Sequence, residues 1–554
     1  MGETEKRLVI FLLLSVAIVY FFTTFSQPVL PPPPATPPPT PSTAAPETAP
    51  PVLSTQSDSG PGEMNPPPAP ARTITIDTPL YRAQLTTAGG VLTRWELKRY
   101  TETVDGADPV VLFPPVDLEA AQAPLSLMLP GLDPATAAAV NGAIYRVEGG
   151  DARLSPARPS ARLRFVADLP APEGDGRTIH VEKELLFHED NYRVDIVVRV
   201  DGIPGPYQFT LGDSFGIHLG QAQWQQQFIG HRGPVSLIDD ELVHDKPEKL
   251  SPGTTTHAGN VQWTALEGKY FLAALIPRMP AGEAAVLKVG DYGVVAGLTL
   301  PAGQRHELAL YAGPKEYKRL TALQIGLEQT IDFGWFMFWS LGLVQVIAKP
   351  LFLLLQFIHG YTHNYAVAII LVTCLIKLLF VPLTHKSYTS MKAMQELQPK
   401  MAELQKKYKD DRERFNKELF LLYKTHKVNP IGGCLPMFLQ VPFFVAFFNI
   451  LYTTIELRHA PFMLWVQDLS AQDPYYVLPI IMGASMFIQQ KIQPTAMDPR
   501  QAKMMLMLPV IFTFFFLTFP AGLVLYWLVN NLLTILQQYV TIRLQKPTAA
   551  AASS

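Results

Sequence analysis

The sequence predicts a polytopic α-helical membrane protein with a large all-β domain outside the membrane. Long apolar runs occupy residues 8–25 and much of the chain after about residue 334. The stretch between them alternates apolar and polar residues and is interrupted by Gly, Pro and Asp, as expected of strands joined by turns. At 554 residues, the chain also exceeds the usual size of one hydrophobic core, which favours at least two domains.

The first apolar run is predicted to be a membrane anchor. Residues 8–25 are uncharged and about long enough to cross a bilayer, and Lys6 and Arg7 precede them. We interpret residues 1–27 as an N-terminal transmembrane signal anchor. A cleaved signal peptide is the alternative, but the run is long and no clear small-x-small cleavage site follows it.

A linker and the all-β domain are expected next. Residues 28–70 are dominated by Pro, Ala, Thr and Ser, a composition typical of a semi-extended tether. Residues 71–325 contain strand-like segments, among them residues 74–77, 193–200, 284–300 and 306–313. A domain of roughly 250 residues suits one large β-sandwich better than two small ones.

Five apolar segments follow the all-β domain. They cover residues 365–383, 434–454, 475–491, 504–519 and 521–540. Together with the anchor they give six predicted spans. We assign residues 364–542 to the membrane core and residues 543–554 to a short cytoplasmic tail.

The distribution of positive charge predicts the orientation of these spans. With a cytoplasmic N-terminus, six spans place the all-β domain outside and residues 385–427 in the cytoplasm. That segment contains eleven Lys and Arg residues, whereas residues 455–474 contain only Arg458. A seventh span within residues 334–357 would reverse this pattern. We therefore expect residues 326–363 to lie along the outer interface, with an amphipathic helix.

The basic segment is predicted to be a helical hairpin. Apolar residues recur at steps of three and four, and Asp410 or Asp411 can cap the second helix. The two apolar stripes are formed by Met391, Met394, Leu397, Met401, Leu404 and Tyr408, and by Phe415, Leu419 and Leu422. The stripes can serve packing within the hairpin, the binding of a partner, or both.

Composition argues against several classes of site. The net charge of −2 gives no basic excess for nucleic acid. Only two cysteines occur, Cys374 and Cys434, and both lie in apolar segments. We therefore expect no disulfide framework and no metal or cofactor site.

Lys377 is the most informative residue, because it places a charge inside an apolar run. Such a charge costs about 2.5–3.5 kcal/mol on insertion scales and persists mainly where it faces water, a partner or the membrane edge. One interpretation is that its side chain extends toward the cytoplasmic end near Thr384. Thr373, one turn earlier on the same face, favours a polar stripe instead.

Other predicted spans supply polar groups for the same region. Gln440 and Asn449 are nine residues apart, so at about 100° per residue they lie on opposite helix faces and only one can line a shared cavity. No acidic residue occurs within the predicted spans, so Lys377 has no obvious buried counter-ion. We expect a hydrated, positively charged groove. Residues on one face of the last span are Gly522, Tyr526, Asn530 and Gln537.

Two other classes of protein fit the sequence less well. A sugar-active enzyme would need an acid and a base facing each other on the sandwich, for which the candidates are His180, His188, Glu184 and His218. No spacing assembles these residues, and each is better explained as a solvated or sheet-face side chain. A secondary transporter would normally show an internal repeat, and none is found in the sequence.

Several segments resemble the YidC family. NPIGGCLPMFLQVPFFVAFF (429–448), ELRHAPFMLWVQDLSAQDPYYVLPIIMG (456–483) and FPAGLVLYWLVNNLLTILQQ (519–538) are similar to its membrane core, and YTSMKAMQELQPKM (388–401) to the start of its hairpin. Within the all-β domain the resemblance rests on the Gly pair at 89–90 and on LYAGPK at 310–315. It implies a five-helix insertase core and a periplasmic sandwich similar to sugar-binding mutarotases.

The resemblance also implies a function. Members of this family are membrane protein insertases and chaperones of the bacterial inner membrane, not enzymes. The implied partners are nascent membrane proteins, the Sec translocon, the lipid bilayer, and ribosomes or targeting factors at the hairpin. Both termini are expected in the cytoplasm.

The resemblance assigns residues to a substrate groove. The family's groove cation is usually arginine, and the matching Lys377 keeps the charge but loses the planar five-donor fork. A substrate-contacting tyrosine of the family falls at Trp527, which keeps the aromatic surface and loses the hydroxyl. The complete predicted groove consists of Thr373, Lys377, Gln440, Tyr526, Trp527 and Asn530.

Overall fold

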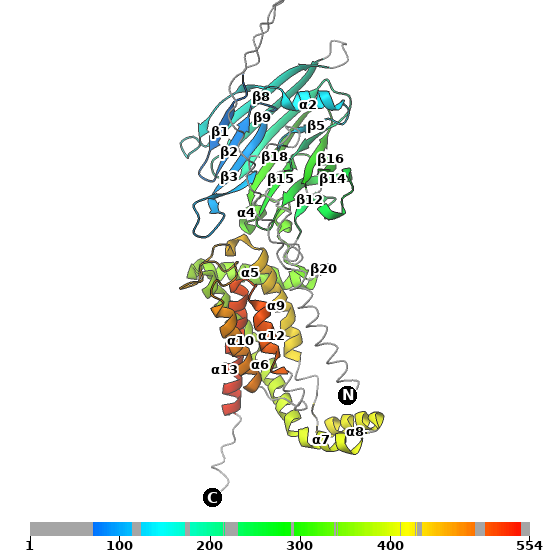
Figure 1. The fold of residues 1–554 in the computed structure, drawn as a ribbon, viewed down its shortest axis with the longest axis vertical. Coiled ribbons are helices and arrows are strands. Elements are labelled where there is room, and N and C mark those ends of the chain that lie inside the picture. The colour runs from blue at the N-terminus through cyan, green and yellow to red at the C-terminus, as the bar shows by residue number, and fades with distance from the viewer. Residues whose placement is uncertain are drawn as a thin grey trace, which may run out of the picture.

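The computed structural model describes residues 70–113, 123–171, 178–213, 215, 231–289, 293–336, 339–340, 342–409, 411–426, 428, 435–492 and 505–544. The predicted signal anchor, nearly all of the linker and most of the tail lie outside these residues. The described chain has a β-rich part at one end and a helical bundle at the other (Figure 1).

Two sheets form the β-rich part, which confirms the predicted sandwich. The smaller sheet has the order β4-β3-β2-β1-β7, and the larger one runs β5-β11-β17-β16-β14-β15-β18-β10-β9-β8-β6, with β12 and β13 joined to it at β14. The strands of the smaller sheet are β1 (Thr73–Asp77), β2 (Tyr81–Thr86), β3 (Val91–Thr101), β4 (Pro109–Phe113) and β7 (Ala152–Arg153). Those of the larger sheet are β5 (Leu127–Met128), β6 (Arg146–Glu148), β8 (Ser160–Pro170), β9 (Thr178–His188), β10 (Arg193–Asp201), β11 (Tyr207–Thr210), β12 (Gly233–Ile238), β13 (Glu241–His244), β14 (Gly253–Glu267), β15 (Phe271–Pro277), β16 (Ala281–Val289), β17 (Gly293–Leu300) and β18 (Arg305–Pro314).

The alternating sequence pattern explains how the sheets pack. Along β9 every second residue is buried, so one face of the strand lies in the core and the other faces outward. Tyr81 of β2 stacks on Trp95 of β3, with ring centroids 4.1 Å apart, and contacts Tyr192 just before β10 at 6.3 Å. Aromatic side chains thus join the two sheets. The described residues within 284–300, expected to be strand-like, belong to two antiparallel strands, β16 and β17.

Glycine is required at the turn between β2 and β3. Gly89 and Gly90 both have positive φ, at 71° and 56°. A Cβ atom on Gly89 would also collide with the carbonyl oxygen of Asn141, which lies in α2 (Pro134–Gly142). The Gly pair noted in the sequence therefore has a conformational cause.

The helical part contains elements of very different length. They are α4 (Tyr317–Ala322), α5 (Gly342–Thr362), α6 (Tyr365–Glu396), α7 (Gln398–Lys407), α8 (Arg412–Thr425), α9 (Leu435–Thr453), α10 (Val477–Ile492), α12 (Leu508–Phe516) and α13 (Ala521–Leu544). Among the described residues, three helical segments are long and apolar enough to cross a membrane: Val344–Thr362, Tyr365–Glu396 and Ala521–Thr541. The described parts of the other predicted spans are shorter, so the count of six stays a prediction.

Helix α5 differs from the other long helices in direction. By length and composition it could cross a membrane. Its axis, however, runs across the sandwich-facing end of the bundle, whereas α6, α9, α10 and α13 run along the bundle (Figure 1). Phe352 of α5 is fully buried against Tyr317 and Phe333.

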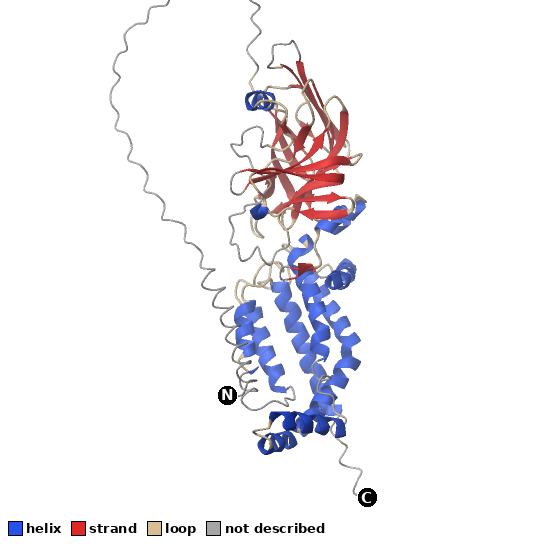
Figure 2. Cartoon of the chain, turned by 90° about the vertical axis from the view of Figure 1, so that its right-hand side faces the viewer, coloured by secondary structure: helices blue, strands red, loops and turns tan. Residues whose placement is uncertain are grey.

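Helix α6 continues to Glu396, well past its predicted span, although Pro382 lies within it. No glycine interrupts this stretch. The hairpin of α7 and α8 follows at the end of the bundle farthest from the sandwich (Figures 1 and 2). The Asp411 side chain caps α8 by accepting from the Arg414 amide at 3.0 Å. Tyr423 of α8 contacts Met401 of α7 at 3.7 Å, so the two helices pack on each other.

Candidate functional site

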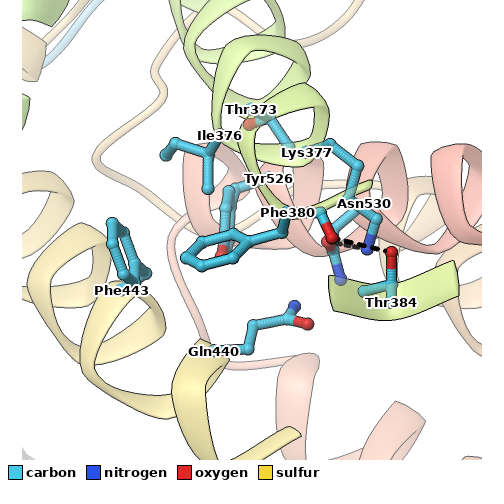
Figure 3. Close-up of a pocket in the computed structure, with 9 residues that line it drawn as sticks. All are labelled: Thr373, Ile376, Lys377, Phe380, Thr384, Gln440, Phe443, Tyr526 and Asn530. Atoms are coloured by element: carbon cyan, nitrogen blue, oxygen red, sulfur yellow. Dashed lines mark hydrogen bonds between the residues drawn. The ribbon is translucent and has the colours of Figure 1, made fainter. Parts of the chain in front are cut away.

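A small pocket lies inside the helical bundle, where α6, α9 and α13 meet. We call it the central pocket. It is lined by Thr373, Ile376, Lys377, Phe380 and Thr384 of α6, Gln440 and Phe443 of α9, and Tyr526 and Asn530 of α13 (Figure 3).

The polar face of α6 follows from helical spacing. Thr373, Lys377 and Thr384 are separated by steps of four and seven residues, which keep side chains on one face. Lys377 is twelve residues after Tyr365, where α6 begins, which corresponds to about 18 Å along the helix. A hydrocarbon core is about 30 Å thick, so Lys377 lies deep within it if Tyr365 marks one edge.

Lys377 has an amide rather than a carboxylate as its partner. Its Nζ donates to Oδ1 of Asn530 at 3.0 Å, across 153 residues of sequence (Figure 3). Within the described part of the chain, no carboxylate acts on this half-buried ammonium group. The amide oxygen contributes only a partial negative charge, so the positive charge remains largely uncompensated.

The other polar side chains of the pocket are also hydrogen-bonded. Gln440 is hydrogen-bonded to the hydroxyl of Tyr526. Thr373 donates to the carbonyl of Ile369 at 2.6 Å. Thr384 accepts a hydrogen bond from Gln537, one of the residues on the predicted polar face of α13. The pocket thus contains several separate hydrogen-bonded polar groups and one cation.

The central pocket is narrow in this conformation. Its volume of about 20 Å³ is enough for about one water molecule. Ile376, Phe380 and Phe443 supply apolar surface around the polar groups. A polypeptide segment would need the helices to separate before it could reach Lys377.

The structure brings five of the six predicted groove residues together and places the sixth elsewhere. Trp527 does not line the central pocket but packs on Phe444, Phe512 and Phe516, with ring centroids 4.8, 6.1 and 5.2 Å away. A step of one residue turns a helix by about 100°, so Trp527 cannot share the direction of Tyr526. The five that line the pocket are Thr373, Lys377, Gln440, Tyr526 and Asn530.

Gln440 and Asn449 lie on different sides of α9, as expected. Gln440 lines the central pocket, whereas buried Asn449 donates to the carbonyl of Phe333 at 2.8 Å. Thr384 is a pocket residue that was not predicted as one. Its position seven residues after Lys377 is the signal that could have identified it.

The candidate enzymatic residues do not converge. His180 pairs with Asp168 at 2.7 Å, and His188 pairs with Asp195 at 2.7 Å. The two histidines are eight residues apart on β9. Eight strand residues span about 27 Å, too far for a shared substrate atom. Glu184, between them, pairs with Arg162 at 3.2 Å, and His218 lies outside the described residues.

Metal-binding clusters of His, Cys, Asp and Glu are absent from the described residues. Cys374 is a free, half-buried thiol in α6. Cys434 lies outside the described residues, so the structure does not test whether the two cysteines approach each other.

Comparisons with known proteins bear on the whole chain. Residues 73–354 match the family described as YidC periplasmic domain, and residues 357–548 match the family described as 60Kd inner membrane protein. The two matches meet within α5.

Proteins from other bacteria are similar over most of this length. A Membrane protein insertase YidC of Syntrophus aciditrophicus is 43% identical over 481 residues, which cover 84% of each chain. One of Geotalea uraniireducens is 41% identical over 544 residues, or 96% of this chain and 98% of the relative. Their name describes insertion of proteins into a membrane and no enzymatic reaction.

A solved structure of an active YidC insertase aligns with 85% of this chain and 92% of its own, with 18% identity and a TM-score of 0.36. At that score, the structural likeness adds no argument. The sequence matches suffice, and they confirm the resemblance: this chain belongs to the YidC family.

Proposed function

We propose that this protein inserts other proteins into the bacterial inner membrane and assists their folding and assembly. The observation that carries the mechanism is Lys377, a cation deep in the bundle whose described partner is the Asn530 amide. An uncompensated charge in such a place attracts water and anionic groups. In this proposal the central pocket is the closed form of a hydrated, positively charged groove.

The groove would lower the cost of moving a polar segment through the bilayer. A short hydrophilic tail of the entering protein exchanges bulk water for the groove, while its apolar segment moves into lipid. No covalent step is needed. Thr373, Gln440, Tyr526 and Asn530 supply hydrogen-bonding groups that can replace water around the tail.

In this proposal the central pocket opens when α9 moves away from α6 and α13. Helix α6 packs extensively on α13, whereas α9 contacts these two helices over few residues and packs mainly on α5. Movement of α9 would therefore widen the pocket at lower cost than separation of α6 from α13. Trp527, which packs on Phe444 of α9, would change its surroundings in the same movement.

The proposed orientation follows from the charge distribution. Both termini and the α7–α8 hairpin lie in the cytoplasm, the sandwich lies in the periplasm, and α5 lies at the outer interface. The exposed basic side chains of the hairpin would meet ribosomes or targeting factors. The Sec translocon would assist with larger substrates, and smaller ones would be inserted by this protein alone.

Charge reversal at the pocket tests the electrostatic part of this mechanism. We expect Lys377→Glu to slow the insertion of a substrate with an acidic translocated tail by at least about tenfold, the ratio for about 1.4 kcal/mol, and to slow one with a neutral tail much less. Two charges about 4 Å apart interact by about 4 kcal/mol at an effective dielectric constant of 20, so the expected loss is conservative. The measurement is the rate of insertion into vesicles that contain the purified protein.

Two further variants serve as controls. Lys377→Arg keeps the charge and should retain insertion of both substrates. Lys386→Glu makes the same charge change on an exposed residue of α6 beyond the pocket, and should leave the ratio of the two rates unchanged. Equal rates for the acidic and neutral tails in Lys377→Glu would rule out the proposed role of the charge.

A further inference from the structure

A second group of cations lies where the sandwich meets the bundle. Lys269 is in the turn between β14 and β15, and its Nζ lies 4.1 Å from the ring centroid of Tyr452 near the end of α9. The same ammonium group lies 4.6 Å from the ring of Tyr270. A turn of the sandwich thus contacts the bundle through a cation held between two aromatic rings.

Two arginines join this lysine. The guanidinium carbon of Arg458 is 6.0 Å from the ring centroid of Tyr270 and 5.7 Å from that of Phe271. Arg232, just before β12, acts electrostatically on Lys269, Tyr270 and Tyr452. We call Arg232, Lys269 and Arg458 the junction cluster; they come from three segments far apart in the sequence.

The junction cluster is held in a poorly solvated place. Burial lowers the pKa of the Lys269 ammonium to about 7, with a further contribution from Arg232. Burial also lowers the pKa values of Arg232 and Arg458. Grouping partly desolvated cations is unfavourable unless an anion compensates them.

The described residues do not supply that anion. Asp468 and Glu102 act on the cluster from a distance, but no described carboxylate forms an ion pair with any of its three members. Asp468 instead accepts from the amides of His459 and Ser470, at 3.1 and 2.7 Å.

Some hydrogen-bond donors of the junction cluster have no acceptor among the described residues. Nε of Arg232 is buried and has no hydrogen-bond partner in the part of the chain that the structure describes. Arg458 donates only to the carbonyls of Thr101 and Glu102, at 2.6 and 3.2 Å. Lys269 contacts the two tyrosine rings but no described acceptor. Several N–H groups therefore remain for a ligand.

The aromatic residues near the junction cluster are of the kind expected at the level of lipid head groups. Exposed tyrosines surround this end of the bundle, namely Tyr361 near the end of α5 and Tyr475 and Tyr476 just before α10. Tyrosines of this kind are enriched where a bilayer meets water.

We infer that Arg232, Lys269 and Arg458 form a binding site for a phosphate group at the junction of the sandwich and the bundle. Guanidinium groups present planar pairs of donors to phosphate oxygens, and the lysine adds a point charge. The ligand is a phosphate anion, either the head group of an anionic phospholipid or a free phosphate. The inference does not depend on insertase activity, because binding is measured without an insertion substrate.

Titration of the full-length protein in a neutral detergent tests this site. The probes are dihexanoyl phosphatidylglycerol, dihexanoylglycerol without a phosphate, and inorganic phosphate. We expect the phosphate-bearing lipid to bind more tightly than dihexanoylglycerol, and Lys269→Gln and Arg232→Gln to weaken its binding at least tenfold. Lys269→Arg should retain binding. The control is Arg153→Gln, which removes an exposed cation on β7 that pairs with Asp77 and should bind like the parent.

The other measurements distinguish a lipid head group from a free phosphate, and ligand binding from an effect on folding. Binding of the lipid alone identifies a phospholipid head group, whereas comparable binding of inorganic phosphate identifies a soluble anion. Both outcomes support the site. In phosphate-free buffer, Lys269→Gln should unfold at no lower temperature than the parent, because it relieves repulsion. Unchanged lipid affinity in the cluster variants, or an equal loss in Arg153→Gln, would overturn the inference.

Discussion

Lys183 is a buried lysine with a role different from that of Lys377. It lies on the inward face of β9, is 1% exposed, and donates to the carbonyls of Gly89 at 2.8 Å, Gly90 at 3.4 Å and Leu125 at 2.7 Å. Burial lowers the pKa of its ammonium group to about 7. The amine thus ties the turn between β2 and β3 to the larger sheet, at the cost of desolvating a cation.

This shift makes the stability of the sandwich depend on pH. Between pH 7 and the unfolded pKa of about 10.4, the unfolded chain binds more protons at Lys183 than the folded chain, so its contribution to stability rises with pH. We expect Lys183→Met to remove the part of the increase in stability with pH that is due to Lys183. The measurement is the thermal unfolding midpoint of the full chain at pH 7, 8 and 9, and parallel curves for parent and variant would contradict the prediction.

At the scale of elements, one carboxyl group joins three helical segments at the junction. Glu456, in the short 3₁₀ helix Ile455–Leu457, accepts from the backbone amide of Tyr317 at the start of α4 and from the Gln356 amide of α5, both at 3.2 Å. Its second oxygen is buried and has no hydrogen-bond partner among the described residues. Burial raises the pKa of Glu456 to about 7.

The raised pKa predicts a proton-dependent junction. The folded chain binds more protons at Glu456 between pH 4.5 and about 7, so this contribution to stability is complete at low pH and is lost as pH rises through 7. Glu456→Gln keeps a side-chain oxygen that can accept from the Tyr317 amide, and it should remove this dependence of stability on pH. Infrared difference spectra should show a protonated carboxyl band that titrates near pH 7 in the parent. If the variant keeps this band, another carboxyl group is responsible.

At the scale of the whole molecule, the sandwich and the α7–α8 hairpin lie at opposite ends of the bundle (Figure 1). The hairpin is rich in Lys and Arg, whereas the loop of residues 455–474 has one arginine. If the bundle crosses a membrane, these two ends face different compartments.

Cysteine labelling tests this orientation. With Cys374 and Cys434 replaced by alanine, we expect Lys406→Cys on α7 to resist an impermeant thiol reagent in intact spheroplasts and to react after lysis. Arg153→Cys on the sandwich should react in both cases, because its side chain is exposed. Labelling of the cysteine at position 406 before lysis would reverse the proposed topology.

The sequence by itself determined the class of each part of the chain. Alternating residues in β9 and β10, the apolar run of α6 and the polar spacing of Thr373 and Lys377 are local patterns, and local periodicity fixes which face of an element is buried. The sandwich, the long apolar helices and the polar face of α6 could therefore be predicted.

Only the tertiary structure decided which distant groups meet. It paired Lys377 with Asn530, turned Trp527 toward Phe512 and Phe516, and assembled the junction cluster from three separate segments. The physical reason is that helix crossing and domain docking depend on the shapes of many side chains at once. Sequence periodicity predicts which face of a helix or strand is buried, but side-chain packing determines which element that face contacts.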